Sequence, residues 1–363
     1  MDRGCITYSA AYLAGAYLGN VMAIPFSVSA TVMALLLLLC MISKKRYTLF
    51  IAASHLALMV AGCTGYRLAE SNRELPQSQL KTHILSKASS IKEKTESYLE
   101  KFTADKENHS TLCALVLGSK YGLEKGLISA YSKAGAMHIL ALSGLHVGII
   151  YTIIGMLLSP LLLIPRGKYI KEIAVLLFLA IYSLVCGAPP SVVRASTMII
   201  LYRIGINSFR NVSRWDALAL SALAIGVFSP LQISSAGFQL SYAAVIGISL
   251  IFPTLNEAFR EIAGADSISG RTTRRLLQKI WDNISISICC QAATLPFVLY
   301  YFGNVANHFI ITNMVAIPVA TAVLYTFSLL ITFQWIPFAN GALTALLNFF
   351  IELLNDSVIY ISN

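Results

Sequence analysis

The chain has 363 residues, of which 56% are hydrophobic and only 12% are charged, and its mean hydropathy is +0.70. Soluble domains carry about 25% charged residues, so this composition excludes an ordinary soluble protein and indicates a polytopic membrane protein. The formal net charge of +10 has two explanations. Lysine and arginine on cytoplasmic loops orient any polytopic protein, and they also attract polyanions such as nucleic acid. We favour orientation as the main cause.

Long apolar runs follow one another through most of the chain. A membrane-spanning helix needs roughly 20 mostly apolar residues, and these runs do not alternate as the strands of a membrane barrel do. We therefore predict an all-α, polytopic helical membrane protein with about 10–11 transmembrane helices. The candidate spans are residues 5–24, 26–42, 47–65, 137–164, 172–187, 189–205, 215–233, 236–253, 284–302, 308–332 and 341–361.

The short loops between these runs differ in charge. If Lys44, Lys45 and Arg46 lie in the cytoplasm, every later short loop that carries lysine or arginine falls on the same side. The loops that carry neither, such as residues 229–235 and 303–307, fall on the opposite side. The positive-inside rule then places the N-terminus inside and the C-terminus outside.

One hydrophilic region, residues 66–134, interrupts the spans. From Leu80 to Phe102, apolar residues recur at helical spacing among lysines and glutamates, which predicts an amphipathic helix on the membrane surface or against the core. We therefore expect N-terminal transmembrane helices over residues 1–65 and a short extracytoplasmic amphipathic helical region over 66–134. A transmembrane domain then follows over residues 135–363.

A second polar stretch lies at residues 254–283. Its later part reads as an interfacial helix with Trp281 at the level of the lipid headgroups. Its basic residues form either a landing site at a cytoplasmic mouth or an orientation signal alone. These residues are Arg271, Arg274, Arg275 and Lys279.

The most unusual stretch runs from Tyr131 to Ile150, because two histidines and a serine lie inside an apolar run. Polar side chains at membrane depth cost free energy, so they usually have a function or a partner. Gly144 and Gly148 form a small-xxx-small pair that would let another helix approach closely. Ser143 and His146 are three residues apart, which also leaves intramembrane hydrolysis as a weak alternative.

Arg194 is the most expensive polar residue within a predicted span. An arginine at the centre of a span costs about 2.5–3.5 kcal/mol, so it should face protein or water. A structural role is the alternative. The other ionisable or strongly polar residues within spans are His138, Gln239, His308, Asn313, Glu352 and Asp356.

Several signatures are missing from the sequence. It contains no G-x-x-x-x-G-K-[ST] motif for ATP and no histidine cluster with metal-ligand spacing. We therefore expect no cofactor, no metal and no enzymatic site, and a motor supplied by another protein. Pro296 and Pro318 lie within spans and predict kinked or broken helices around a polar cavity.

Several blocks of this sequence resemble the competence domain of the ComEC/Rec2 family, the DNA-uptake channels of natural transformation. The blocks are L-G-S-K-Y-G-L (117–123), A-G-A-M-H-I-L-A-L-S-G-L-H-V-G (134–148), G-A-P-P-S-V-V-R-A-S-T-M (187–198), S-P-L-Q-I-S-S-A-G-F-Q-L-S-Y-A-A (229–244), A-T-L-P-F-V-L-Y-Y-F (293–302) and N-M-V-A-I-P (313–318).

The resemblance implies a multi-pass channel in the bacterial inner membrane that passes single-stranded DNA into the cytoplasm. The polar and aromatic residues of the blocks would then line the DNA path. These residues are His138, Ser143, His146, Ser191, Arg194, Phe238, Gln239, Ser241 and Tyr242.

The expected partners are single-stranded DNA, membrane lipid, an extracytoplasmic DNA receptor, and a cytoplasmic helicase, ATPase or strand-binding protein. Many family members also have an OB-like and a metallo-β-lactamase-like domain. Neither is legible here, so nuclease activity, if needed, is expected from another chain or from a part of the protein outside this sequence. A transporter of small molecules or lipid precursors is the alternative function.

Overall fold

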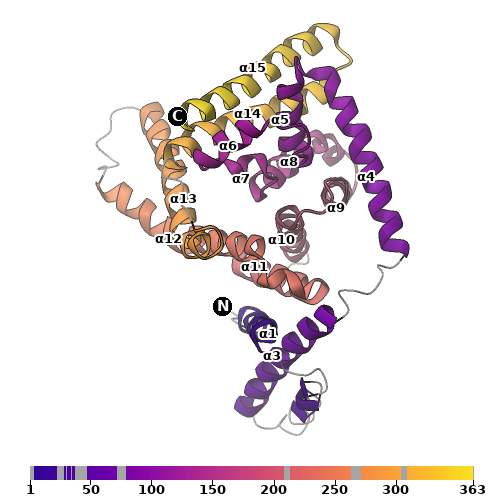
Figure 1. Cartoon of the computed structure of the whole chain (residues 1–363), viewed down its shortest axis with the longest axis vertical. Helices are drawn as coiled ribbons and strands as arrows, with labels where there is room; N and C mark the ends of the chain where they lie inside the picture. The colour runs from indigo at the N-terminus through magenta and orange to yellow at the C-terminus, as the bar shows by residue number, and fades with distance from the viewer. Residues whose placement is uncertain are drawn as a thin grey trace. The chain divides into compact units, whose positions relative to one another are not determined.

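A computed structural model describes residues 4–22, 28–29, 31–33, 35–36, 47–71, 79–207, 213–262, 271–303 and 309–362. Every regular element in these ranges is a helix, which confirms the predicted all-α class (Figure 1). The α-helices are α1 (Gly4–Val21), α3 (Tyr47–Ser71), α4 (Gln79–Leu99), α5 (Lys106–Leu117), α6 (Lys125–Lys133), α7 (Met137–Leu140), α8 (Gly144–Leu157), α9 (Gly167–Val185), α10 (Pro190–Asn207), α11 (Arg214–Phe228), α12 (Ala236–Ile262), α13 (Arg271–Phe302), α14 (Phe309–Phe333) and α15 (Pro337–Ser362). Short 3-10 helices are η2 (Glu100–Phe102), η3 (Ser159–Leu163) and η4 (Pro230–Ser234).

Four of the described helices are long and apolar enough to cross a membrane: Ala236–Phe259 in α12, Leu277–Phe302 in α13, and all of α14 and α15. The chain is therefore a polytopic helical membrane protein. The predicted span 308–332 matches α14 to within one residue, and the span 341–361 lies inside α15. The predicted span 137–164 is instead broken into α7, α8 and η3. Most of the predicted span 26–42 lies outside the described residues.

The helices form two compact units, residues 1–82 with 193–239 and residues 83–192 with 240–363. These units divide the chain along different lines from the three-part organisation expected from the sequence, which stays a prediction.

In the first unit, α1 and α3 meet backbone to backbone through glycines. A Cβ added at Gly15 would lie 1.6 Å from the carbonyl oxygen of Met59, and one at Gly62 would lie 2.1 Å from that of Tyr12. Only glycine permits this approach, which is the geometry that a G-x-x-x-G pair such as Gly15 and Gly19 allows between membrane helices. The Tyr12 hydroxyl donates to the carbonyl of Gly226 (3.3 Å) and so ties α11 to the pair.

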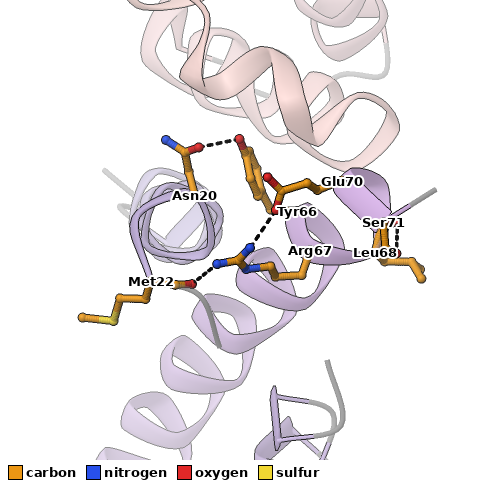
Figure 2. Close-up of polar contacts among 7 residues, drawn as sticks. All are labelled: Asn20, Met22, Tyr66, Arg67, Leu68, Glu70 and Ser71. Carbon is orange, nitrogen blue, oxygen red and sulfur yellow. Dashed lines mark hydrogen bonds and ion pairs between the residues drawn. The ribbon is translucent and has the colours of Figure 1, made fainter. Parts of the chain in front are cut away.

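Polar contacts close the same helix pair where α1 ends (Figure 2). The Tyr66 hydroxyl donates to Asn20 Oδ1 over 2.6 Å. Arg67 donates to the carbonyl oxygen of Met22, and its Nη1 lies 2.7 Å from Glu70 Oε2. A guanidinium beside the carbonyl end of a helix is favoured by the helix dipole.

The second unit is built around α5, which the sequence had placed within the hydrophilic region. Residues 111–117, T-L-C-A-L-V-L, are all buried, and those from Leu112 on belong to one apolar cluster with α14 and α15. In Figure 1, α5 and α6 lie beside α14 and α15. The end of α4 joins this cluster through Leu99, and η2 joins it through Phe102, so the amphipathic helix reaches the core.

A ladder of asparagines joins α15 to α5. Asn348 Oδ1 accepts from the backbone N–H of Ala104 (2.8 Å) and from Asn108 Nδ2 (3.2 Å). Asn348 Nδ2 donates to the carbonyls of Phe102 (3.0 Å) and Thr344 (2.8 Å). These four bonds use the full hydrogen-bonding capacity of the amide.

Asn355 forms the second rung of the ladder, two turns further along the same face of α15. Its Nδ2 donates to Glu107 Oε1 and to Thr111 Oγ1, both over 3.2 Å. Its Oδ1 accepts from the hydroxyl of Tyr131 over 3.0 Å. The polar side of α15 is thus covered by α5 and α6, which explains how a membrane helix can carry these amides.

We expect Asn348→Ala to lower the free energy of unfolding by about 2–4 kcal/mol, because it leaves several buried polar groups unpaired. Thermal unfolding of the purified protein in detergent measures the loss. Ser357→Ala is the matched control, since that hydroxyl bonds only to Leu354 of its own helix. Equal stability of the two variants would contradict this assignment.

Glu107 should make the stability depend on pH. Burial raises the pKa of its carboxyl above the ordinary value of 4.5, and the charges of Glu124 and Asp105 raise it further. A raised folded pKa means that protonation stabilises the fold below pH about 4.5, and this contribution is lost as the pH rises through the folded pKa.

Glu107→Gln should therefore melt above the wild type at pH 7, and the difference should shrink toward pH 4. Thermal unfolding across this pH range measures it, with the exposed Glu100→Gln as the control. A variant whose pH profile matches that of the wild type would refute the role of Glu107.

Candidate functional site

The segment between α6 and α8 is a broken helix. Gly135, at φ +76°, ends α6 in a Schellman turn, with Ala136 N donating to the Tyr131 carbonyl over 2.8 Å. The single turn of α7 follows, and Ala141 and Ser143 are extended before α8 begins. In a membrane, freed backbone groups of this kind must be satisfied by protein or water.

Ser143 and His146 cap the start of α8. The backbone N–H of Ser143 donates to His146 Nδ1 over 3.3 Å, and the Ser143 hydroxyl lies 2.9 Å from the same nitrogen. Because Nδ1 accepts, this hydrogen-bond pattern places the ring proton on Nε2. His146 is only 2% exposed, and its Nε2 has no hydrogen-bond partner among the described residues. The site therefore presents a buried N–H donor.

His138 has the opposite arrangement. Its Nδ1 donates to the carbonyl of Gly135 over 3.0 Å, so its Nε2 is left as an acceptor. The side chain is exposed, and it lies close enough to His146 for the two rings to interact electrostatically. The two imidazoles thus offer one donor and one acceptor beside the same helix break.

The segment at residues 141–143 is held in place by residues that are distant in the sequence. The Ser191 hydroxyl donates to the Leu142 carbonyl over 2.5 Å. The side chain of Leu142 covers Gly118, where an added Cβ would lie only 2.7 Å from Leu142 Cδ1. Gly118 also has φ +65°, a left-handed conformation that favours glycine. Its place at the end of α5 therefore fixes where Leu142 can lie.

Helix ends around the break are also closed by side chains. The Tyr182 hydroxyl of α9 donates to the Val116 carbonyl near the end of α5 (2.7 Å). The Thr312 hydroxyl of α14 donates to the Ala134 carbonyl at the end of α6 (2.8 Å). Both are terminal carbonyls that lack a partner within their own helices. Side chains of α9 and α14 therefore satisfy terminal carbonyls of α5 and α6.

The turn that presents Ser191 is strained. Gly187 has φ +82° and Ala188 has φ +50°, and a left-handed alanine costs about 1–3 kcal/mol. The turn leads directly into Pro189 and the start of α10. Strained backbone of this kind tends to persist at functional positions, because the surrounding structure enforces it.

Arg194 belongs to the other compact unit. It is 3% exposed, and its Nη1 lies 3.9 Å from the position that a Cβ on Gly237 would take. Gly237 is in the first turn of α12, which Ser235 caps by accepting from the Phe238 N–H over 3.3 Å. A helix N-terminus is itself electropositive, so a guanidinium beside it creates a strongly anion-attracting position.

The remaining predicted site residues lie on α12, α8 and α13. Phe238 and Tyr242 are buried, and Gln239 donates to the Ile233 carbonyl over 3.4 Å. Ser241 is half-buried on the same helix. Their shared lining of one path with His138, Ser143, His146, Ser191 and Arg194 stays a prediction.

The structure gives positions for the predicted packing glycines and for the basic residues of α13, but it does not test their roles. A Cβ on Gly148 would meet no atom within 4 Å among the described residues, so the packing role of Gly144 and Gly148 also stays a prediction. The helix expected at residues 271–281 is present, since α13 begins at Arg271. Arg274 and Arg275 lie in its first turns, and Lys279 is exposed.

Intramembrane hydrolysis by Ser143 and His146 stays an alternative prediction. The Ser143 hydroxyl is within hydrogen-bond reach of His146, but a catalytic base also needs a third group that orients its ring. No described residue bonds to His146 Nε2. The contact is accounted for by the capping of α8.

Gly118, Leu142 and Tyr182 are structural parts of the site that the sequence analysis did not single out. A glycine directly after the apolar run 111–117 is the usual signal of a helix C-terminus, and it could have located Gly118. Nothing local in the sequence links Tyr182 to Val116, because their pairing depends on the tertiary fold.

The model of the Competence protein family matches residues 115–363. ComE operon protein 3 of Bacillus subtilis (strain 168) is 32% identical over 218 residues, which cover 60% of this chain and 25% of that protein. A protein of Aquifex aeolicus (strain VF5) described as uncharacterized is 32% identical over 160 residues, which cover 42% of this chain and 36% of that protein. No solved structure matches.

The chain therefore spans about a quarter and about a third of the length of these two relatives. The family match begins at Leu115 within α5 and includes the helix break, Arg194 and the first turn of α12. Since the match covers more than half of the chain, this protein belongs to the Competence protein family, of the ComEC/Rec2 type.

Proposed function

We propose that this chain is an inner-membrane channel that passes single-stranded DNA into the cytoplasm during natural transformation. The observation that carries the proposal is the helix break at residues 141–143, which leaves the buried Nε2–H of His146 without a partner among the described residues. A buried donor of this kind costs free energy unless an oxygen atom or water occupies it. Family membership supplies the cargo, since competence is the uptake of DNA.

The residues divide into two chemical roles. Arg194, beside the N-terminus of α12, would attract backbone phosphates. Ser143, His146 and Ser191 would offer neutral hydrogen-bonding groups, and weak distributed contacts suit a conduit better than one tight site. Aromatic side chains such as Tyr242 could stack on bases without reading the sequence.

The proposal requires other proteins. An extracytoplasmic receptor would deliver the DNA, a nuclease on another chain or outside this sequence would supply single strands, and a cytoplasmic helicase, ATPase or strand-binding protein would draw the strand inward. The basic start of α13, at Arg271, Arg274, Arg275 and Lys279, is the proposed contact for the emerging strand. Its cytoplasmic position follows from the positive-inside orientation, with the N-terminus inside and the C-terminus outside.

A transporter of small molecules or lipid precursors is the second candidate, because broken helices also form the binding sites of transporters. A deletion strain separates the two functions. The channel proposal expects DNA to bind the cell surface but not to enter. Normal transformation with an altered envelope composition would favour the transporter.

Arg194→Ala should reduce uptake of labelled DNA by about tenfold or more, because a charge-assisted contact contributes about 1.5–3 kcal/mol. Arg194→Lys should retain part of the activity. Arg203→Ala, on the same helix and half-buried, is the matched control. Uptake is normalised to the amount of folded protein in the membrane. Loss of folded protein in Arg194→Ala would instead make Arg194 a structural residue.

Gly118→Ala should also lower uptake, because it adds left-handed strain and pushes Leu142 away from the helix break. Gly126→Ala is the control, since a Cβ there meets no atom within 4 Å. Combining Gly118→Ala with Leu142→Ala should show coupling, with the glycine substitution costing less in the double variant. Strict additivity of the two changes in uptake would disprove the link between Gly118 and the break.

A further inference from the structure

A cavity of about 480 Å³ lies between α4, α5, α8, α9 and α14, within one compact unit, and residues 141–143 are not among those that line it. Its walls are aliphatic and aromatic, from residues such as Ile91, Ile154, Ile181, Leu324 and Phe327. This volume falls within the range of ordinary ligand pockets, about 300–1,000 Å³. None of the residues assigned to the DNA path lines it.

Every hydroxyl that lines the cavity is already bonded to the protein. Thr95 donates to the Ile91 carbonyl (2.8 Å), and Tyr182 donates to that of Val116 (2.7 Å). Ser328 and Thr332 each donate to a carbonyl one turn back in α14, over 2.7 Å. The Tyr98 hydroxyl donates to Gln334 Oε1. Because these donors are used, an acceptor group of a polar ligand would lose its water without a replacement donor, which costs about 1–3 kcal/mol for each such group.

The cavity is walled by helices of the membrane domain. α14 is one of the candidate spans, and α8 is a shorter apolar helix. Ile91, Leu157 and Ile181 line the cavity and are also exposed, so it opens at the protein surface. An apolar chain could therefore enter directly from the surrounding lipid.

Charges of both signs border the cavity along α4, since Glu96 and Lys92 both act electrostatically on Cys113 of α5. Lys92 directly follows Ile91, is half-buried and is near enough to interact electrostatically with Cys113 of α5 and with Cys186, just after α9. Lys92 forms no ion pair with a described residue. The ammonium of Lys101 lies 5.1 Å from the centre of the Tyr98 ring, and Tyr98 lines the cavity.

We propose that this cavity binds one acyl chain of an anionic phospholipid, whose phosphate lies against Lys92. An apolar occupant fits the cavity best, because its hydroxyls already donate to the protein. The membrane supplies acyl chains at the opening. Lys92, which also acts on Cys186 on the α9 side of the cavity, favours a negatively charged headgroup over a zwitterionic one there. The bound lipid would join α4 to α8, α9 and α14.

The test uses the full chain in nanodiscs of phosphatidylcholine that contain a small fraction of phosphatidylglycerol with a photoreactive diazirine on its acyl chain. Mass spectrometry locates and quantifies the crosslinks. We expect crosslinks at cavity residues such as Ile154 and Phe327 to exceed those at the lipid-facing Leu250. Ile154→Trp fills the cavity and should reduce the cavity crosslinks by about fivefold or more. Met156→Trp, on the same helix but outside the cavity, should not.

The headgroup is tested separately with a diazirine-labelled phosphatidylcholine. The wild type should crosslink the anionic lipid several-fold more than the zwitterionic one, and Lys92→Gln should reduce that ratio while Lys94→Gln does not. Thermal unfolding checks that each variant is folded, and Ile331→Phe replaces Ile154→Trp if that variant is not. Uniform labelling over the lipid-facing surface would overturn the proposal that the cavity binds an acyl chain. Equal labelling of the cavity in the wild type and in the filled variant would do the same. Equal labelling by both lipids would overturn the role of Lys92.

Discussion

The structure depends on one constraint, which is that backbone polar groups within a lipid bilayer must find partners inside the protein or its water. An unbroken helix meets this constraint by itself, whereas the segment from α6 to α8 does not. Its freed carbonyls are instead satisfied by side chains from other helices, Ser191 to Leu142 and Thr312 to Ala134. Tyr182 does the same for the end of α5. The family blocks 134–148 and 187–198, which are far apart in sequence, are thus joined by a hydrogen bond that satisfies a backbone carbonyl.

The same constraint explains where the polar side chains of the second unit lie. Asn348 and Asn355 could not face lipid, and α5 covers them with complementary amide, hydroxyl and carboxyl groups. A helix that begins in a hydrophilic region therefore becomes part of the core. The apolar half of α5 packs against α14 and α15, while its polar first turn completes the ladder. His146 differs from these residues because its Nε2 is left without a protein partner among the described residues.

Much of the fold could be predicted from the sequence, because long apolar runs report transmembrane helices directly. The helix class and the positions of α14 and α15 followed from hydropathy, and the family followed from its motifs. The burial of α5 did not, since its apolar run of 111–117 is too short to register as a span. The break at residues 141–143 was also hidden, because Ala141 and Leu142 are good helix formers, and it is tertiary bonds such as that from Ser191 to the Leu142 carbonyl that hold this segment outside a helix. The predicted path through Ser143, His146 and Arg194 rests on polar residue types and on the resemblance to the family.

The pairing of α1 with α3 has a mechanical consequence. Where two helices touch through side chains, rotamer changes can widen or narrow the space between them. At Gly15 and Gly62 the two main chains are already in contact, so no side chain is left to adjust. The distance between these helices is thus set by the thickness of the polypeptide itself. This pair can serve as a rigid spacer of constant width while other parts of the protein change conformation.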